Sequence, residues 1–292
     1  MGSYVKNQLH ALVFLIICLI ASVAMAQQED QPENDSLSRK ETHKELRKAF
    51  RKDNRQVFVS FSGVKAKLNT TASFDVQDGL LTANVGLEKN LGLPSEKSFF
   101  TGSIMYRITP SSGIYAKYYG IDRAKSYTTK EDVIFLRDTL PAGSEARGYF
   151  NTQVASAGYL LSLLKDPNAF LGAYLNIYVM SLGTGVSSDL GNIDAKVNFT
   201  APLPNLGLVA LFKLKEWLYI NGNIGFFSLY LDDFNGSLYD FSASLMFKPI
   251  KWFGIDVSYQ EFDIRVVFPN DDIQTTIDYN FRGPAVGLNF LF

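Results

Sequence analysis

AVGLNFLF, residues 285–292, closes the chain with a run in which apolar side chains return at every second position. Successive side chains of a β-strand point to opposite faces, so this spacing gives the segment one apolar face. The apolar positions are Val286, Leu288, Phe290 and Phe292. A strand that is apolar on one face and stops on an aromatic residue is what a transmembrane β-barrel requires as its closing strand.

The same stretch resembles the C-terminal assembly signal of bacterial outer-membrane proteins. Gly287, Phe290 and Phe292 stand at the matching spacing, while Ala285 takes the place of the usual polar residue at the first signal position. The resemblance implies that the outer-membrane barrel assembly machinery reads these three residues. It also implies outer-membrane lipid and lipopolysaccharide as the surroundings of the folded chain.

The N-terminus independently indicates export. Lys6 precedes an apolar run over residues 11–23, and Ala24-Met25-Ala26 ends the run as a small-residue cleavage site. The run falls short of the roughly 20 residues that a spanning helix needs, so we expect residues 1–26 to be a signal peptide. Cys18, the only cysteine, lies inside it, which leaves the mature chain without disulfides or thiolate metal sites.

A polar leader, residues 27–54, separates the signal from the patterned part of the chain. Its first part has the composition of a flexible linker, and from Thr42 onward it can form a short basic helix. A periplasmic contact or a plug would be the functional interpretation. We favour a partly disordered, solvated periplasmic leader to the first strand.

From residue 55 to the end, period-two alternation predicts an all-β fold, a transmembrane antiparallel β-barrel of about 10–12 strands. The clearest case is residues 192–201, where Ile193 and Val197 share one face and Asp194 and Lys196 the other. By the same parity, ten polar or charged residues are candidates to face the lumen. They are Arg107, Lys117, Asn176, Asp194, Lys196, Asn221, Asn223, Asp240, Asp256 and Gln260.

The lengths of the strand segments and of the turns favour a sheet that crosses lipid over a water-soluble sheet. A tilted membrane crossing takes about 9–11 residues, whereas soluble strands run about 5–6. Short turns are expected at the periplasmic end, at residues 109–112, 165–168, 215–216 and 248–251. This arrangement requires residues 190–214 to cross once, and residues 56–93 to form one long strand or a hairpin near Asp78-Gly79. The apolar parity changes at Gly283-Pro284, which predicts a β-bulge there.

With these segments defined, the chain resembles a family of uncharacterised outer-membrane β-barrels of Gram-negative bacteria. The matching pieces are LEKNLGL (87–93), LPAG (140–143), APLPNLGL (201–208), FSLYLDDFNGSLYD (227–240) and DYNFRGPAVGLNFLF (278–292). The resemblance implies location in the cell outer membrane. It implies no activity, ligand or catalytic residue.

Catalysis is not expected. The chain has two histidines, His10 in the signal peptide and His43 in the leader. Without an imidazole in the barrel, a Ser/His/acid arrangement cannot be assembled. Acidic loop pairs such as Asp232-Asp233 suit hard cations, but Asp, Asn and Gly are also what tight hairpins need, and we favour the turn interpretation. We expect no cofactor, no metal and no nucleic-acid partner.

Two roles remain open. The lumen-facing residues either line a narrow, porin-like passive channel for small solutes or pair with one another and fill a structural barrel, since about 8 strands give a filled interior and 16–18 an open one. The alternative is a surface-binding barrel whose outer loops engage an external ligand or envelope partner. In that case residues 114–135 would extend past the membrane and supply aromatic contacts from Tyr115, Tyr118, Tyr119 and Tyr127.

Overall fold

A computed structural model describes residues 56–76, 82–90, 92–128, 133–135, 138–188, 193–231, 234–268 and 273–292. The predicted signal peptide and leader lie outside these residues. In chain order the elements are β1 (Val57–Val76), β2 (Thr82–Gly86), α3 (Leu87–Asn90), β3 (Glu96–Thr109), β4 (Ser112–Thr128), β5 (Val133–Phe135), β6 (Asp138–Leu140), β7 (Glu145–Lys165), β8 (Ala169–Ser188), β9 (Ile193–Lys215), β10 (Leu218–Leu231), β11 (Phe234–Ile250), β12 (Phe253–Phe268) and β13 (Ile273–Leu291).

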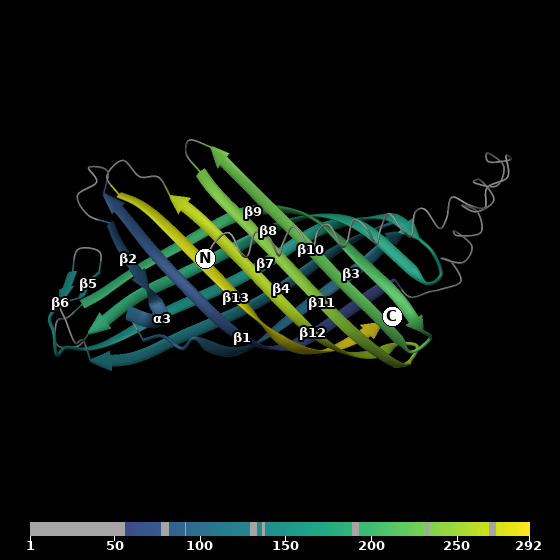
Figure 1. The fold of residues 1–292 in the computed structure, drawn as a ribbon, viewed down its shortest axis with the longest axis horizontal. Coiled ribbons are helices and arrows are strands. Elements are labelled where there is room, and N and C mark those ends of the chain that lie inside the picture. Colours follow the sequence, from purple (N-terminus) through teal and green to yellow (C-terminus); the bar gives the residue numbers. More distant parts are fainter. Residues whose placement is uncertain are drawn as a thin grey trace, which may run out of the picture. The chain divides into compact units, whose positions relative to one another are not determined.

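The long strands form a closed antiparallel cylinder, which confirms the predicted fold class (Figure 1). In the described part of the chain, ten strands follow one another in the order β1-β3-β4-β7-β8-β9-β10-β11-β12-β13, and β13 pairs back onto β1. Backbone hydrogen bonds between Val57 and Phe292, at 3.0 and 2.8 Å, fasten the two ends of the barrel together. Closure removes the sheet edges that lipid could not satisfy.

The short turns lie at the end of the cylinder that carries Val57 and Phe292, as predicted. β3 and β4 are joined at Pro110-Ser111, β9 and β10 at Glu216-Trp217, and β11 and β12 at Lys251-Trp252. Figure 1 shows these connections at the end where the C-terminus is marked. In outer-membrane barrels this end faces the periplasm.

Around this half of the barrel, large apolar side chains point away from the lumen. Phe100 is 84% exposed, Phe226 69% and Val257 60%. Similar side chains lie on the strands in between, among them Ile104, Leu175, Ile177, Leu206 and Leu288. Such a continuous apolar surface is what a strand segment presents to hydrocarbon. Among the described residues there is no helix long and apolar enough to cross a bilayer.

Farther from the periplasmic end, the apolar face changes sides. On β12, Val257 and Tyr259 are exposed, whereas Phe262 and Ile264, three and five residues further on, are only 4% and 1% exposed. Glu261 stands at the transition. The outer half of each long strand thus packs around an apolar core, as a water-soluble sheet does.

The same change of side explains the parity shift on β13, and the predicted bulge at Gly283-Pro284 is wrong. The register with β12 runs without a break from Phe281, opposite Phe262, to Val286, opposite Val257. Phe281 is 3% exposed and belongs to the core, while Val286 is 57% exposed. The apolar residues switch from lumen to lipid without any residue being inserted.

The strand pairing decides three points about how individual segments cross the barrel. Within residues 56–93, β1 and β2 form a hairpin, because β2 pairs with Thr71–Asp75 of β1. The predicted turn at Asp78-Gly79 lies outside the described residues. The predicted single crossing over residues 190–214 is confirmed from Ile193 onward as β9, and residues 190–192 lie outside the described residues. Residues 114–135 do not form one strand, since β4 ends at Thr128 and β5 pairs with β6 as a separate hairpin.

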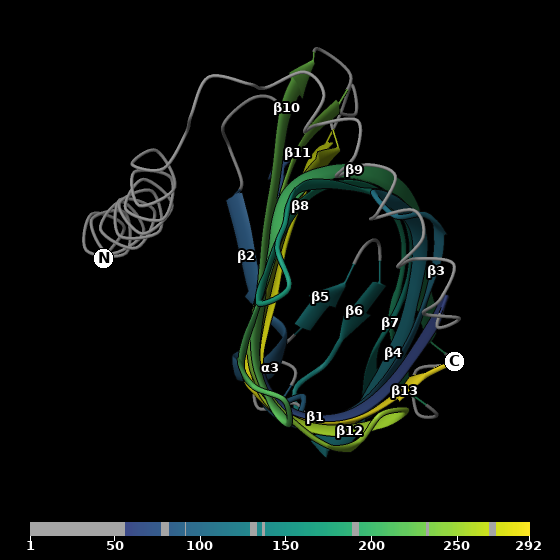
Figure 2. The ribbon, with the colours of Figure 1, turned by 90° about the vertical axis from the view of Figure 1, so that its right-hand side faces the viewer.

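The barrel wall is not continuous in its outer half. The described pairing of β3 with β4 ends at Thr101 and Tyr119, and that of β9 with β10 ends at Leu206 and Phe226. Figure 2 shows β8 and β9 curving away from β10 and β11 beyond that point. Pro202 and Pro204 lie in the part of β9 that β10 has left, where a missing N–H is tolerated.

Candidate functional site

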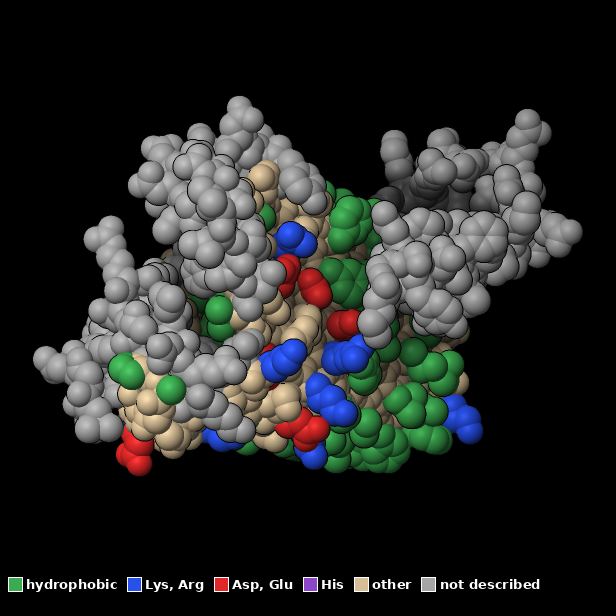
Figure 3. All heavy atoms as spheres, turned by 60° about the vertical axis from the view of Figure 1, so that its left-hand side comes forward, with side chains coloured by type: hydrophobic (Ala, Val, Ile, Leu, Met, Phe, Trp, Pro, Cys, Tyr) green, Lys and Arg blue, Asp and Glu red, His purple; other side chains and the backbone are tan. Residues whose placement is uncertain are grey.

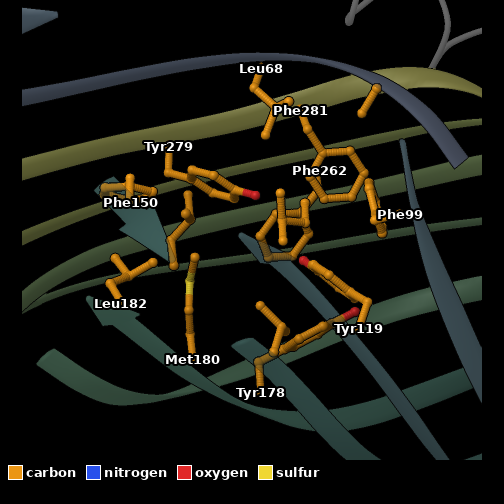
Figure 4. Packing of buried hydrophobic residues seen from close by; sticks show 14 of the residues in the cluster. Leu68, Phe99, Tyr119, Phe150, Tyr178, Met180, Leu182, Phe262, Tyr279 and Phe281 are labelled. Atoms are coloured by element: carbon orange, nitrogen blue, oxygen red, sulfur yellow. The ribbon is translucent and has the colours of Figure 1, made fainter. Parts of the chain in front are cut away.

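The candidate functional site is the interior of the barrel. At mid-height it holds a layer of aromatic rings from β3, β4, β8, β12 and β13 (Figure 4). The rings of Phe99 and Phe281 meet edge to face at 5.3 Å, and those of Phe262 and Phe281 stack at 5.6 Å. Offset and edge-to-face pairs of this kind contribute beyond the apolar area they bury.

This aromatic layer bridges strands that are not neighbours in the wall. Phe262 on β12 contacts Tyr119 on β4 at 6.2 Å and Tyr178 on β8 at 5.8 Å, measured between ring centroids. Phe150 on β7 stacks with Tyr279 on β13 at 6.0 Å. Because these rings meet across the cylinder, they occupy the lumen at this level.

Beyond the aromatic layer a buried ion pair anchors the short helix α3. The Arg123 side chain, on β4, donates to Glu88 of α3 and to Thr70 Oγ1 on β1, the latter at 2.7 Å. Glu88 also accepts from the Thr70 backbone N–H at 2.9 Å. Arg123 is 1% exposed and lies over the Phe150 ring, 5.0 Å from its centroid. The pair ties the β2–α3 connection to the inner wall.

On the periplasmic side of the aromatic layer, the lumen holds a polar cluster around Asp240. Asp240 accepts from the Tyr178 hydroxyl and from Asn223 Nδ2, the latter at 2.5 Å. Ser242 Oγ donates to Asn223 Oδ1 at 2.5 Å. Closer to the periplasmic end, Asp256 accepts from Asn289 at 2.5 Å. These bonds link wall strands through side chains instead of leaving the carboxylates to an open bore.

Several buried polar atoms near this cluster have no hydrogen-bond partner among the described residues. Asn205 is 0% exposed, and neither atom of its amide is paired; Tyr174 Oη and Ser156 Oγ are also unpaired. Asn205 and Tyr174 lie against the wall at Gly225, where an added Cβ would stand 2.4 Å from Tyr174 Oη. Glycine there lets both side chains lie flat along the wall. Buried polar atoms of this kind usually bind ordered water.

The predicted lumen candidates occupy different parts of the barrel. Asn176, Asp240 and Asp256 are buried, at 1%, 9% and 8% exposure. Asn176 Nδ2 donates to Tyr115 Oη at 2.9 Å. The partly buried candidates are Arg107, Lys117, Asn221, Asn223 and Gln260. Asp194 and Lys196 are in β9 at positions whose side chains lie outside the described residues.

Residues of the predicted assembly signal pack at the periplasmic rim. Gly287 is buried where an added Cβ would stand 2.4 Å from Asp256 Oδ1, so any larger residue would displace the Asp256 side chain. The Phe290 ring contacts Phe253 at 5.5 Å and stacks on Phe292 at 6.4 Å. Their role in assembly stays a prediction.

Sequence reasoning missed the aromatic layer and the Glu88–Arg123 pair. Glu88 and Arg123 are 35 positions apart in the chain, and no local pattern links them. The proposed aromatic recognition surface on residues 114–135 is not formed by the tyrosines described. Tyr119 is 2% exposed inside the barrel, and Tyr118, 54% exposed, lies on the lipid side of β4.

Two hollows lie above the apolar band of the barrel. One, of about 510 Å³, is lined by Lys67, Leu68, Asn69, Ser95, Glu96, Glu261, Asp263, Asn280, Phe281 and Arg282. The other, of about 630 Å³, is lined by Lys97, Asp122, Arg123, Ala124, Arg147, Tyr149 and Asn151. Burial, helped by the carboxylates of Asp278 and Glu261, raises the pKa of Asp263, which lies beyond the membrane-spanning part of β12.

Comparison with solved structures finds barrels of the same kind. The outer membrane protease OmpT from Escherichia coli matches with a TM-score of 0.50 and 13% identity, over 81% of this chain and 97% of that one. This chain is an outer-membrane β-barrel. With the exposed apolar band, the fold confirms the predicted location in the cell outer membrane. At this identity the likeness to OmpT shows the fold alone.

Other outer-membrane barrels match with lower TM-scores. The transport unit of the autotransporter AIDA-I from Escherichia coli has a TM-score of 0.39 at 12% identity, over 90% of this chain and all of that one. Ail, the attachment invasion locus protein of Yersinia pestis, has 0.31 at 14% identity, over 79% and 99%. A comparison with protein-family models finds no match, and a comparison with curated proteins finds none either.

Proposed function

We propose that this barrel is a non-conducting, non-catalytic structural protein of the outer membrane. The observation that carries the proposal is the aromatic layer, in which Phe262 meets both Tyr119 and Tyr178 across the lumen. The rings block a water-filled path at mid-height. Of the two interpretations left open by the sequence, a filled barrel is therefore favoured over a narrow passive channel.

A second candidate role is binding at the cell surface. The observation in its favour is the hollow of about 630 Å³ beside the place where β3 and β4 separate. Lys97, Arg147, Tyr149 and Asn151 line it, which offers cations, a phenol and an amide to an external ligand. This site replaces the tyrosines on residues 114–135 as the candidate contact surface.

The absence of catalysis belongs to the same proposal. OmpT is a protease, and histidine is the side chain that most often serves as general base in enzymes. The present chain has His10 and His43 only, both before residue 55. The carboxylates of the lumen, Asp240 and Asp256, are engaged by donors from the wall instead of facing a nucleophile.

Planar-bilayer recording of the purified, refolded protein tests the proposal directly. We expect no discrete current steps from the folded, heat-modifiable form. Reproducible unitary steps would show that the aromatic layer leaves a conducting path, and the channel hypothesis would replace the structural one. Lipid A from cells lacking the protein is expected to keep its acyl pattern. An altered pattern would point to an enzyme.

A further inference from the structure

The hollow of about 510 Å³ is built from four neighbouring strands at one level of the barrel. Lys67 on β1 stands opposite Glu96 on β3 and Arg282 on β13, and Arg282 stands opposite Glu261 on β12. These four residues form one row across the sheet. The next row outward places Asn69, Asn280 and Asp263 side by side. Charged groups and amides are thus held at fixed spacing by the ladder.

The cations of this row, and Lys65 one row nearer the periplasmic end, are accessible and only loosely paired. The Lys67 and Lys65 ammonium groups both approach Glu96, at 4.0 and 3.9 Å, with lysine side chains 75% and 71% exposed. Contacts at that distance between exposed groups contribute little. Arg282 is exposed, and no ion pair is found for it among the described residues. Two lysines and an arginine can therefore turn toward an incoming anion.

Directly toward the periplasm, the same strands carry the lipid-facing surface. Phe100, 84% exposed, stands opposite Gly63, and Val286 and Val257 continue that row on β13 and β12. Figure 3 shows blue and red side chains gathered beside the green apolar surface of this face. The strands rise about 3.3 Å per residue and are tilted, so the four steps from Gly63 to Lys67 span the depth of a lipid headgroup layer.

We propose that this hollow binds the phosphorylated sugar headgroup of an outer-leaflet glycolipid. The phosphate lies between Lys65, Lys67 and Arg282, and the amides of Asn69 and Asn280 bond sugar hydroxyls. The acyl chains of the same molecule cover Phe100 and its neighbours. The cations Lys65, Lys67 and Arg282 are balanced by the carboxylates of Glu96, Glu261 and Asp263, so net charge does not select the ligand. Continuity of the hollow with the apolar band is what favours a lipid over a soluble anion. The assignment needs only the outer-membrane location and is independent of the proposed non-conducting role.

Glu96 gives the proposal its sharpest test. Its carboxylate competes with a phosphate for Lys65 and Lys67. Glu96→Gln removes the competitor and one negative charge, so binding of a phosphorylated glycolipid becomes tighter. Were the lysine–glutamate contacts only structural, the same change would leave lipid binding unaltered.

The experiment is native mass spectrometry of the purified barrel in detergent, titrated with diphosphoryl lipid A, with phosphatidylethanolamine as reference lipid. We expect the doubly substituted Lys67→Gln, Arg282→Gln protein to bind diphosphoryl lipid A about tenfold more weakly, the sum of two exposed charged contacts. Lys215→Gln with Lys251→Gln removes two cations at the periplasmic end and is expected to bind as the native protein does. Heat-modifiable migration verifies that each variant is folded.

Three outcomes would overturn the assignment. The first is equal affinity of the native protein and the Lys67, Arg282 variant for diphosphoryl lipid A. The second is loss of native binding in a chelator, which would mean that divalent cations bridge the lipid to carboxylates. The third is competition in which inorganic phosphate displaces diphosphoryl lipid A as strongly as the lipid itself binds. That result would mean that the site recognises phosphate and not a lipid.

Discussion

Tyr119 and Phe262 lie across the barrel from each other, with ring centroids 6.2 Å apart, although β4 and β12 are separated by other strands on both sides. The contact joins two parts of the wall that hydrogen bonds do not connect. It also places two rings across the lumen, so we expect these two side chains to help close it.

Removing both rings is expected to open a conducting path. The Tyr119→Ala, Phe262→Ala protein should show current steps in a planar bilayer where the native protein is silent, at a cost of about 3–5 kcal/mol per buried ring in stability. Tyr118→Ala, on the lipid side of the same strand, is the control and should remain silent. If the double variant folds and stays silent, other side chains close the lumen.

Arg123→Gln is expected to destabilise the outer half of the barrel. It leaves Glu88 partly buried without its cation, a change that costs about 3–5 kcal/mol when one partner of a buried pair is removed. Urea unfolding in lipid vesicles measures the loss. Arg265→Gln, at an exposed pair 3.7 Å from Asp278, is the control and should change stability by about 0–1 kcal/mol. Equal effects would mean that the buried pair is not the anchor of α3.

Gly225→Ala is expected to disturb the polar cluster in the lumen. The added methyl would stand 2.4 Å from Tyr174 Oη and 2.6 Å from Asn205 Oδ1, and overpacking of this kind costs about 1–3 kcal/mol. Thermal unfolding measures the change, and Tyr174→Ala in the same chain should recover part of it. Gly102→Ala, whose new contact with the Phe61 ring would be an ordinary 3.6 Å, should be tolerated. No recovery in the double variant would place the strain elsewhere.

Phe292→Ala is expected to reduce assembly more than stability. The ring stacks on Phe290 and is 60% exposed, so its loss removes little buried area. The amount of heat-modifiable protein in the outer membrane should fall, while protein refolded in vitro should unfold at nearly the same urea concentration. Ile250→Ala, an exposed apolar residue at the same end, should assemble normally. A parallel loss in both measurements would make Phe292 a structural residue.

The sequence predicted the lipid-facing half of the barrel because one alternating pattern determines it. Ile177 and Val257 point outward, and Asn176 and Asp256 point inward, as parity required. The periplasmic turns followed from their short spacing. In this half, the outward-facing positions are apolar and the inward-facing positions are polar. The local sequence alone therefore predicts which way each side chain points.

The outer half was not predicted because its apolar residues also alternate, but they occupy the inward-facing positions of the strands instead of the outward-facing ones. Phe281 and Val286 both read as apolar strand residues, and nothing local tells which faces lipid and which faces the core. The Glu88–Arg123 pair and the separation of β3 from β4 depend on contacts between distant segments. Such contacts are set by tertiary packing, which single-sequence periodicity does not record.

The prolines of β9 have a consequence for how neighbouring barrels meet. The described ladder between β8 and β9 continues through Pro202 and Pro204, so their missing N–H groups face the side that β10 has left. A strand of another molecule that paired with β9 at this border would lack the two N–H donors that proline cannot supply. This strand border is thereby protected against edge-to-edge polymerisation in a crowded cell envelope.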